Sequence, residues 1–122
     1  MILGIDTSCY TTSVALMNQE SRLTCDMRRL LAVEKGARGL RQSEAVYAHT
    51  QNLPQLLAEL FDQHPAQQLT AIAVSAKPRP VDNSFMPVFT SGYGAARILA
   101  AALQIPLLAF SHQEGHLAAA LW

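Results

Sequence analysis

The stretch MILGIDTSCYTTSVALM, residues 1–17, decides the fold of this chain. It begins with an apolar run that ends in the carboxylate of Asp6, and it ends with an extended pattern that puts Val14 and Leu16 on one face. The residues between the two runs are rich in hydroxyl groups, which favour turns. We therefore expect the chain to begin with a β-hairpin.

The rest of the chain reads as a third strand followed by alternating helices and strands. Residues 32–41 are polar and basic and contain Gly36 and Gly39, so they predict a loop. Pro54 lies inside the first long helical pattern and predicts a kink or a break there. The expected elements are strands at 1–6, 13–17 and 22–31, a helix at 43–62, a strand at 69–76, a helix at 95–104, a strand at 105–110 and a helix from Glu114 onward.

Residues 77–94 connect the fourth strand to the second helix. The prolines at 78, 80 and 87 exclude a regular helix or a central strand in the first part of this segment. Residues 91–94, with the sequence SGYG, are expected to open the helix at 95–104. Because that helix is apolar on nearly every side, we expect it to be buried.

The predicted order of elements is β-β-β-α-β-α-β-α, which is typical of an α/β protein. Three strands linked by hairpins, followed by two right-handed crossover units, predict a mixed five-stranded sheet flanked by helices. At 122 residues, the chain has the size of a single domain, which we place at residues 1–122.

Composition narrows the range of function classes. Lys plus Arg and Asp plus Glu both number 9, so no net positive charge favours nucleic-acid binding. Cys9 and Cys25 lack CxxC spacing and are interpreted as reduced thiols. No stretch approaches ~20 uninterrupted apolar residues, so we expect a cytoplasmic protein without a membrane partner. Residues 117–122 form good helical sequence that stops without a terminating signal, which suggests that a natural continuation is missing.

The two histidines in SHQEGH, residues 111–116, are the strongest candidate metal ligands. His112 and His116 are four residues apart, so in a helix they lie on one face about 6 Å apart at Cβ and can reach one ion. They follow a predicted strand, and ligand sites in α/β sheets lie at such carboxyl ends. The alternative is a pair of partly exposed histidines at a helix start. Two ligands are also fewer than a metal site normally needs.

The turn after Asp6 is a second candidate site. Hydroxyls of Thr7, Ser8 and neighbouring threonines, with backbone N–H groups, could bind phosphate oxygens, while Asp6 could hold magnesium through water. The alternative is an Asx or ST turn that closes the hairpin. Cys9 lies in the same turn, but no base lies near it in sequence, which disfavours a nucleophilic role.

Three other groups of residues carry weaker signals. Residues 75–89 contain Lys77, Arg79 and Asp82 but lack the glycines of a phosphate loop. His49 is interpreted as a half-buried polar tip on a helix. The basic residues near the third strand are expected to form a solvated surface rather than an RNA contact. These basic residues are Arg28, Arg29, Lys35, Arg38 and Arg41.

Several of these blocks together resemble the Gcp/TsaD family. Its members were formerly called O-sialoglycoprotein endopeptidases and are now associated with threonylcarbamoyladenosine synthesis on tRNA. The resemblance runs over the whole chain, and the spacing of the blocks is more specific than any single block. The matching blocks are ILGIDTSC at 2–9, SVAL at 13–16, His49 with NLP at 52–54, AIAV at 71–74, IPL at 105–107 and HQEGH at 112–116.

The resemblance implies an actin-like ATPase (ASKHA, ribonuclease H-like) fold of two similar halves, of which this chain is the first. It implies that His112 and His116 hold a divalent metal, iron or zinc, and that ATP or an adenylate binds near residues 6–9, with magnesium as a further candidate ion. The implied reaction is transfer of threonylcarbamoyl to tRNA adenosine. The implied partners are the chain's own C-terminal half, a TsaB-like protein and tRNA. We expect this half alone to be inactive, and a homodimer through its normally covered surface is a further expectation.

Two departures from the family pattern fall in the expected cleft. Tyr10 and Thr11 stand where the family usually has two acidic residues, and residues 77–80, with the sequence KPRP, replace a glycine-rich segment. We therefore interpret the chain as a divergent paralogue. The main alternative function is a non-catalytic, TsaB-like scaffold. A metallo-glycoprotease is the third, disfavoured because the glutamate does not directly follow the first histidine as it does in HExxH.

Overall fold

The computed structural model describes residues 1–122. The elements in chain order are β1 (Ile2–Asp6), β2 (Thr11–Met17), β3 (Leu23–Leu30), α1 (Gln42–Gln63), the short 3₁₀ helix η1 (Ala66–Gln68), β4 (Ala71–Lys77), α2 (Phe89–Leu103), β5 (Leu107–Ser111) and α3 (His112–Leu121). This order confirms the predicted sequence of strands and α-helices. None of the helices is both long and apolar enough to span a bilayer.

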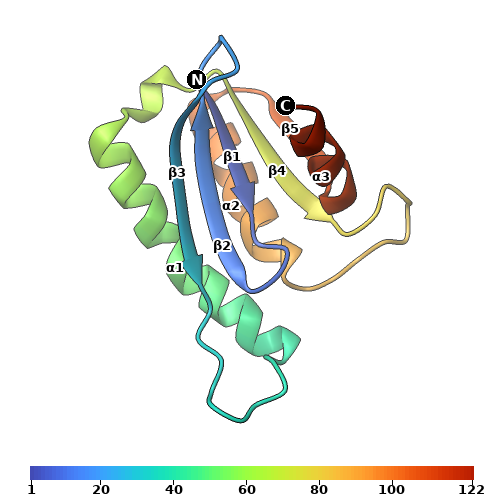
Figure 1. The fold of residues 1–122 in the computed structure, drawn as a ribbon. Coiled ribbons are helices and arrows are strands. Elements are labelled where there is room, and N and C mark those ends of the chain that lie inside the picture. The colour runs from blue at the N-terminus through green and yellow to red at the C-terminus, as the bar shows by residue number, and fades with distance from the viewer.

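The five strands form one mixed sheet in the order β3-β2-β1-β4-β5. β1 pairs with β2 and β2 with β3 in antiparallel fashion, whereas β1 pairs with β4 and β4 with β5 in parallel (Figure 1). The predicted mixed five-stranded sheet is therefore confirmed. Because β1, β4 and β5 run in the same direction, their carboxyl ends meet at one edge of the sheet, where ligands of such folds bind.

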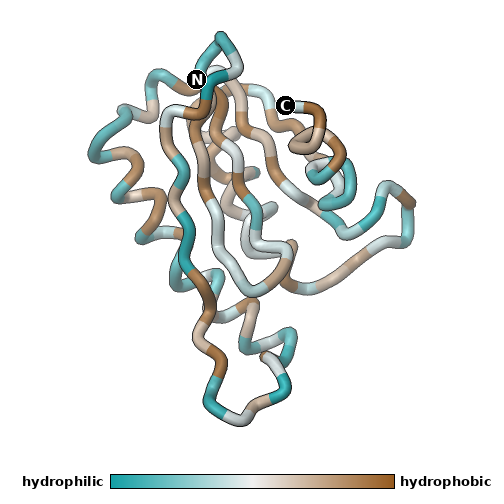
Figure 2. Tube along the Cα trace, viewed as in Figure 1, coloured by the Kyte–Doolittle hydropathy of each residue, from teal (hydrophilic) through white to brown (hydrophobic).

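The two faces of the sheet are covered unequally. α1 and α2 pack on one face over alternating buried strand residues such as Leu3, Val14 and Ile72. α3 lies on the opposite face, near β4 and β5 (Figure 1). None of the residues of α3 is buried, and the apolar side chains near its end, Leu117 and Leu121, are exposed. The end of α3 is hydrophobic in its residue composition (Figure 2).

α2 differs from its predicted form in two respects. It begins at Phe89, so residues 91–94 lie inside its first turns and do not open it. A Cβ on Gly92 would lie 2.9 Å from the Thr7 hydroxyl oxygen, so this glycine permits close packing of α2 on β1. The prediction of a helix buried on all sides is also wrong, because Ile98 is 71% exposed. One stripe of α2 is buried against the sheet, and the rest of the helix surface is partly or fully exposed to solvent.

α1 is a single helix from Gln42 to Gln63, although Pro54 lies inside it. The sequence predicted a kink or a break at Pro54, and the break does not occur. Proline removes one helical hydrogen bond, but the buried residues Leu53, Leu56 and Leu60 on either side of it pack into the main core. Tertiary packing outweighs the local cost of the proline.

Candidate functional site

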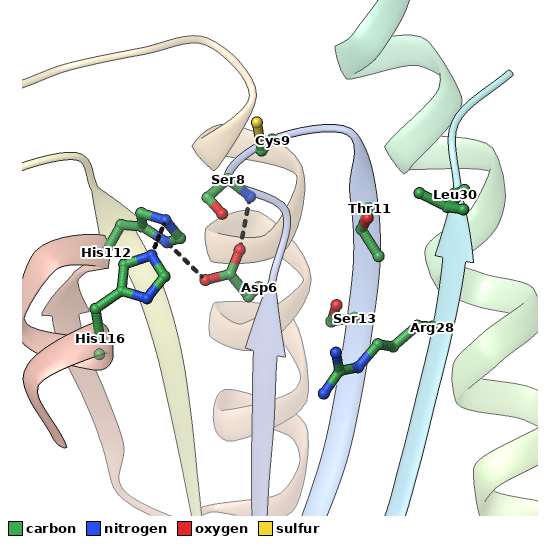
Figure 3. A pocket seen from close by; sticks show the side chains of 10 residues that line it. Asp6, Ser8, Cys9, Thr11, Ser13, Arg28, Leu30, His112 and His116 are labelled. Carbon is green, nitrogen blue, oxygen red and sulfur yellow. Dashed lines mark hydrogen bonds and ion pairs between the residues drawn. The ribbon is translucent and has the colours of Figure 1, made fainter. Parts of the chain in front are cut away.

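An open pocket of about 770 Å³ lies where β1 ends and α3 begins (Figure 3). It brings together residues from the first and last parts of the chain. The lining residues are Asp6, Ser8, Cys9, Thr11, Ser13, Arg28, Leu30, His112, Gly115 and His116. Five of the six site residues predicted from sequence therefore surround one space.

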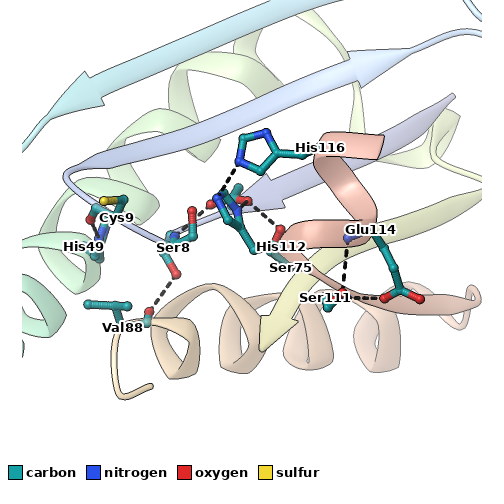
Figure 4. Close-up of polar contacts among 11 residues, drawn as sticks. Ser8, Cys9, His49, Ser75, Val88, Ser111, His112, Glu114 and His116 are labelled. Atoms are coloured by element: carbon teal, nitrogen blue, oxygen red, sulfur yellow. Dashed lines mark hydrogen bonds and ion pairs between the residues drawn. The ribbon is translucent and has the colours of Figure 1, made fainter. Parts of the chain in front are cut away.

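The start of α3 is determined by Ser111. Its buried hydroxyl accepts a hydrogen bond from the Glu114 backbone N–H, and the Glu114 carboxylate accepts one from the Ser111 N–H at 2.7 Å. This capping box makes His112 the first helical residue, at the junction of strand and helix that the sequence predicted. It also directs the Glu114 carboxylate away from the histidines (Figure 4). These hydrogen bonds hold the pKa of Glu114 below its usual value.

Replacing Ser111 with alanine should lower the free energy of unfolding by about 1 kcal/mol, because the cap hydroxyl and its acceptor role are lost. Thermal and denaturant unfolding, followed by circular dichroism, measure this change. Ser43→Ala is the matched control, since Ser43 is an exposed serine in the first turn of α1. Equal stability of both variants would contradict the role of Ser111 in starting α3.

The imidazoles of His112 and His116 converge. Their Nε2 atoms are 2.8 Å apart, and the ring centroids are separated by 4.3 Å with an interplanar angle of 78° (Figures 3 and 4). The Nδ1 atom of His112 lies 3.3 Å from Asp6 Oδ2. A carboxylate only accepts, so Nδ1 carries the proton and the lone pair of Nε2 points toward His116. A carboxylate behind the liganding imidazole is the usual support of a histidine metal ligand.

This arrangement fits part of a metal site. Two imidazole nitrogens bound to one tetrahedral zinc ion lie about 3.3 Å apart, because each zinc–nitrogen bond is about 2.0 to 2.1 Å. A small opening of the His112–His116 pair from 2.8 Å reaches that separation. No group of three or more His, Cys, Asp and Glu residues in the chain is placed to hold a metal. The chain thus offers two ligands, and a complete site needs further groups.

Asp6 is held by several hydrogen bonds. The Ser75 hydroxyl donates to Oδ2, and the Ser8 backbone N–H donates to Oδ1 at 2.7 Å. Burial alone would raise the pKa of Asp6, but these bonds and the contact with His112 outweigh it and keep the pKa below its usual value. The bond to Ser8 forms the Asx turn that was the structural alternative for this segment. Asp6 is therefore an ionised carboxylate that orients its neighbours.

Thr7 does not face the pocket. Its buried hydroxyl donates to the Val88 carbonyl at 2.8 Å and accepts from the Gly92 N–H at 3.1 Å. The side chain therefore ties the end of β1 to the start of α2. Ser8 and Cys9 line the pocket, and Cys9 is exposed. Of the four residues predicted to bind a cofactor, the structure brings Asp6, Ser8 and Cys9 to the pocket.

His49 is fully buried and is not the half-buried tip that the sequence predicted. Its Nε2 lies 2.8 Å from the Cys9 carbonyl and its Nδ1 lies 2.8 Å from the Thr12 hydroxyl, to which Asn52 also donates. A carbonyl only accepts, so Nε2 carries the proton and Nδ1 accepts from Thr12. This network fastens the β1–β2 loop to α1. One sequence signal could have placed Thr12 in the core. Thr12 alternates with Val14 and Leu16, so all three side chains lie on the same face of β2.

Arg28 is the pocket residue that the sequence reasoning assigned elsewhere. It was expected on a solvated basic surface, and its side chain is 68% exposed, but it also lines the pocket across from the histidines (Figure 3). None of the residues in the candidate segment 75–89 lines the pocket, although Ser75 bonds Asp6. Lys77 donates to the Val81 carbonyl and the Arg79 N–H donates to Ser84, so the loop is bonded within itself.

Comparisons with known proteins identify relatives of the chain. A family model described as TsaD, tRNA N6-adenosine threonylcarbamoyltransferase, matches residues 31–122. A protein of that name from Neorickettsia sennetsu is 34% identical over 98% of this chain and 34% of its own length. Another from Campylobacter concisus is 33% identical over 96% of this chain and 34% of its own length. The chain spans about one third of the length of these relatives.

Solved structures agree with this fold. YeaZ from Pseudomonas aeruginosa has a TM-score of 0.65 and 26% identity, covering 90% of this chain and 43% of that one. RuvC from Thermus thermophilus has a TM-score of 0.54 and 15% identity, covering 92% of this chain and 64% of that one, and shows a shared fold alone. These likenesses confirm the predicted ribonuclease H-like, ASKHA-type fold. The family-model match over residues 31–122, three quarters of the sequence, shows that the chain belongs to the TsaD family.

Proposed function

We propose that this chain is one lobe of a TsaD-like transferase that moves a threonylcarbamoyl group to a tRNA adenosine. His112 and His116 hold a divalent metal, iron or zinc, and the loop that contains Asp6, Ser8 and Cys9 faces a bound ATP or adenylate. The observation that carries the proposal is the convergence of the two imidazoles, with Asp6 behind one of them. A magnesium ion at the nucleotide is part of the same proposal.

A second lobe supplies the rest of the site. The chain spans about one third of its curated relatives and offers only two metal ligands, so the 122-residue chain alone is expected to show no turnover. The proposed partners are this second lobe, a TsaB-like protein and tRNA. A homodimer through the exposed end of α3, at Leu117, Leu121 and Trp122, is an alternative assembly of the isolated chain.

The chain's own residues position groups rather than carry the proton transfer. Asp6 fixes the tautomer of His112, and its hydrogen bonds to Ser8 and Ser75 leave it poorly suited to accept a proton from the substrate amine. A divalent metal would supply Lewis-acid activation and a template for anionic oxygens. Ser8 and Cys9 line the pocket beside the histidines. The lowered pKa of Asp6 keeps this orienting carboxylate ionised at neutral pH.

A non-catalytic partner-binding module is the second candidate function. The likeness to YeaZ favours it, as does the presence of Tyr10 and Thr11 where the family usually has acidic residues. Metal binding separates the two candidates, because a scaffold does not need the two histidines to converge. The metallo-glycoprotease alternative receives no support from Glu114, whose carboxylate belongs to the capping box.

Replacing Asp6 with asparagine should weaken divalent metal binding by about 10- to 100-fold, the usual effect of removing an outer-shell carboxylate. Asparagine keeps the volume but loses the charge that supports His112. Titration of the chain with Zn²⁺ by calorimetry measures the affinity. Asp62→Asn is the matched control, because Asp62 is an exposed carboxylate near the end of α1 and does not line the pocket. Equal zinc affinity in all three proteins would contradict the proposed role of Asp6.

A further inference from the structure

We propose that Arg28 and Ser13 form a subsite for a phosphate-class oxyanion on the wall of the pocket that faces the histidine pair. The inference rests on the proposed function in one respect, since it assigns the second wall of the same pocket. It goes further because the family resemblance assigns no role to either residue. The ligand is a tetrahedral anion, either free phosphate or a phosphate group of a nucleotide.

The strand register places the subsite. Asp6 pairs with Ser13 across β1 and β2, and Ser13 pairs with Arg28 across β2 and β3. All three side chains therefore lie in one row on the same face of the sheet. Neighbouring strands are about 4.8 Å apart, so the Arg28 Cα lies roughly 10 Å from that of Asp6. The Arg28 side chain extends over β2 in the direction of β1 (Figure 3).

The guanidinium is aimed by a neighbour on its own strand. Its Nε and Nη2 donate to the two oxygens of Asp26 at 3.0 and 2.8 Å, which raises the pKa of Arg28 and fixes the plane of the group. The two N–H bonds of Nη1 remain for another acceptor. A surface ion pair of this kind contributes little to the stability of the fold. A role in ligand binding is therefore a better explanation of its geometry than a role in folding.

A tetrahedral oxyanion matches the donors around this space. The guanidinium lies on one side, the hydroxyls of Ser13 and Thr11 lie on β2, and the imidazoles lie on the far side. The guanidinium on β3 and the two hydroxyls on β2 offer hydrogen-bond donors from two neighbouring strands, which suits an oxyanion with several peripheral oxygens. The Asp6 carboxylate lines the same pocket and repels an anion. A cation at the histidine pair would therefore strengthen phosphate binding, and phosphate would strengthen cation binding equally.

Calorimetric titrations of the 122-residue chain with inorganic phosphate, ATP and adenosine, each with and without Zn²⁺, test the subsite. Arg28→Gln should weaken the binding of the phosphate-bearing ligands by about 10- to 100-fold, the loss expected for a charge-assisted hydrogen bond. Adenosine binding should not change. Arg28→Lys keeps the positive charge but lacks the planar guanidinium donors, so it should lose less affinity than Arg28→Gln. Arg22→Gln is the matched control, because Arg22 is an exposed arginine in the β2–β3 turn, paired with Glu20.

The outcomes separate this inference from the proposed function. A loss confined to ATP assigns the subsite to a nucleotide phosphate, whereas a loss for both ligands assigns it to any phosphate. Unchanged affinity in Arg28→Gln, or no phosphate binding by the wild-type chain under either condition, overturns the inference. Zinc binding that depends on the histidines despite such a result leaves the metal proposal standing. An Arg28 effect without zinc binding refutes the metal proposal alone.

Discussion

Replacing His112 and His116 together with alanine abolishes specific binding of Zn²⁺ or Fe²⁺ by the chain. The loss should exceed the 10- to 100-fold effect of removing an outer-shell group, because both protein ligands disappear. The Nε2 atoms that now face each other at 2.8 Å are replaced by methyl groups on the exposed face of α3. Elemental analysis of the purified protein and calorimetric titration measure metal content and affinity.

The expected loss has a clear control within the chain. His64→Ala removes another histidine, at the end of α1, which makes no contact with the pocket. His64→Ala should bind metal like the wild-type chain, and both variants should keep the wild-type unfolding midpoint because none of the three replaced rings is buried. Equal metal content in the double variant and the wild type would remove the metal proposal and leave the partner-binding module as the better candidate.

The parts of the site that the sequence predicted are those that local geometry determines. His112 and His116 share a helical face because four residues make about one turn, and this holds whatever the rest of the chain does. The Asx turn at Asp6 and Ser8 is equally local. The order of strands and helices followed from periodicity and from the constraints on connections in α/β folds.

The parts that the sequence did not predict depend on pairing between distant segments. Arg28 belongs to the pocket only because Ser13 pairs with it and with Asp6, and a shift of one residue would turn it to the other face. The close packing of α2 on β1 depends on Gly92, whose missing side chain lets the helix approach Thr7. Taken alone, the sequence SGYG predicts only the start of a helix. It carries no information about the strand that packs against the glycine.

His49 belongs to a buried polar network that holds the β1–β2 loop, which forms part of the pocket wall. Replacing it with alanine should lower the free energy of unfolding by about 2 to 4 kcal/mol, because the Cys9 carbonyl and the Thr12 hydroxyl lose their partner and a cavity remains. His64→Ala, in a partly exposed site, should cost far less. Denaturant unfolding at pH 7.5 gives the comparison. Similar losses in the two variants would contradict a structural role for the His49 network.

The same residue makes stability depend on pH with a definite sign. Burial lowers the pKa of His49, against smaller opposing effects of the Cys9 carbonyl and Asp6, so the folded chain keeps the ring neutral while the unfolded chain takes up a proton near pH 6.5. The unfolded state then binds more protons, and the unfolding free energy falls as the pH drops from about 6.5 through the lower folded-state pKa. Protonation also removes the lone pair that accepts from Thr12. Denaturant unfolding of His49→Gln between pH 7.5 and 5 should lack this part of the slope, and an unchanged slope would place the pH dependence on another group.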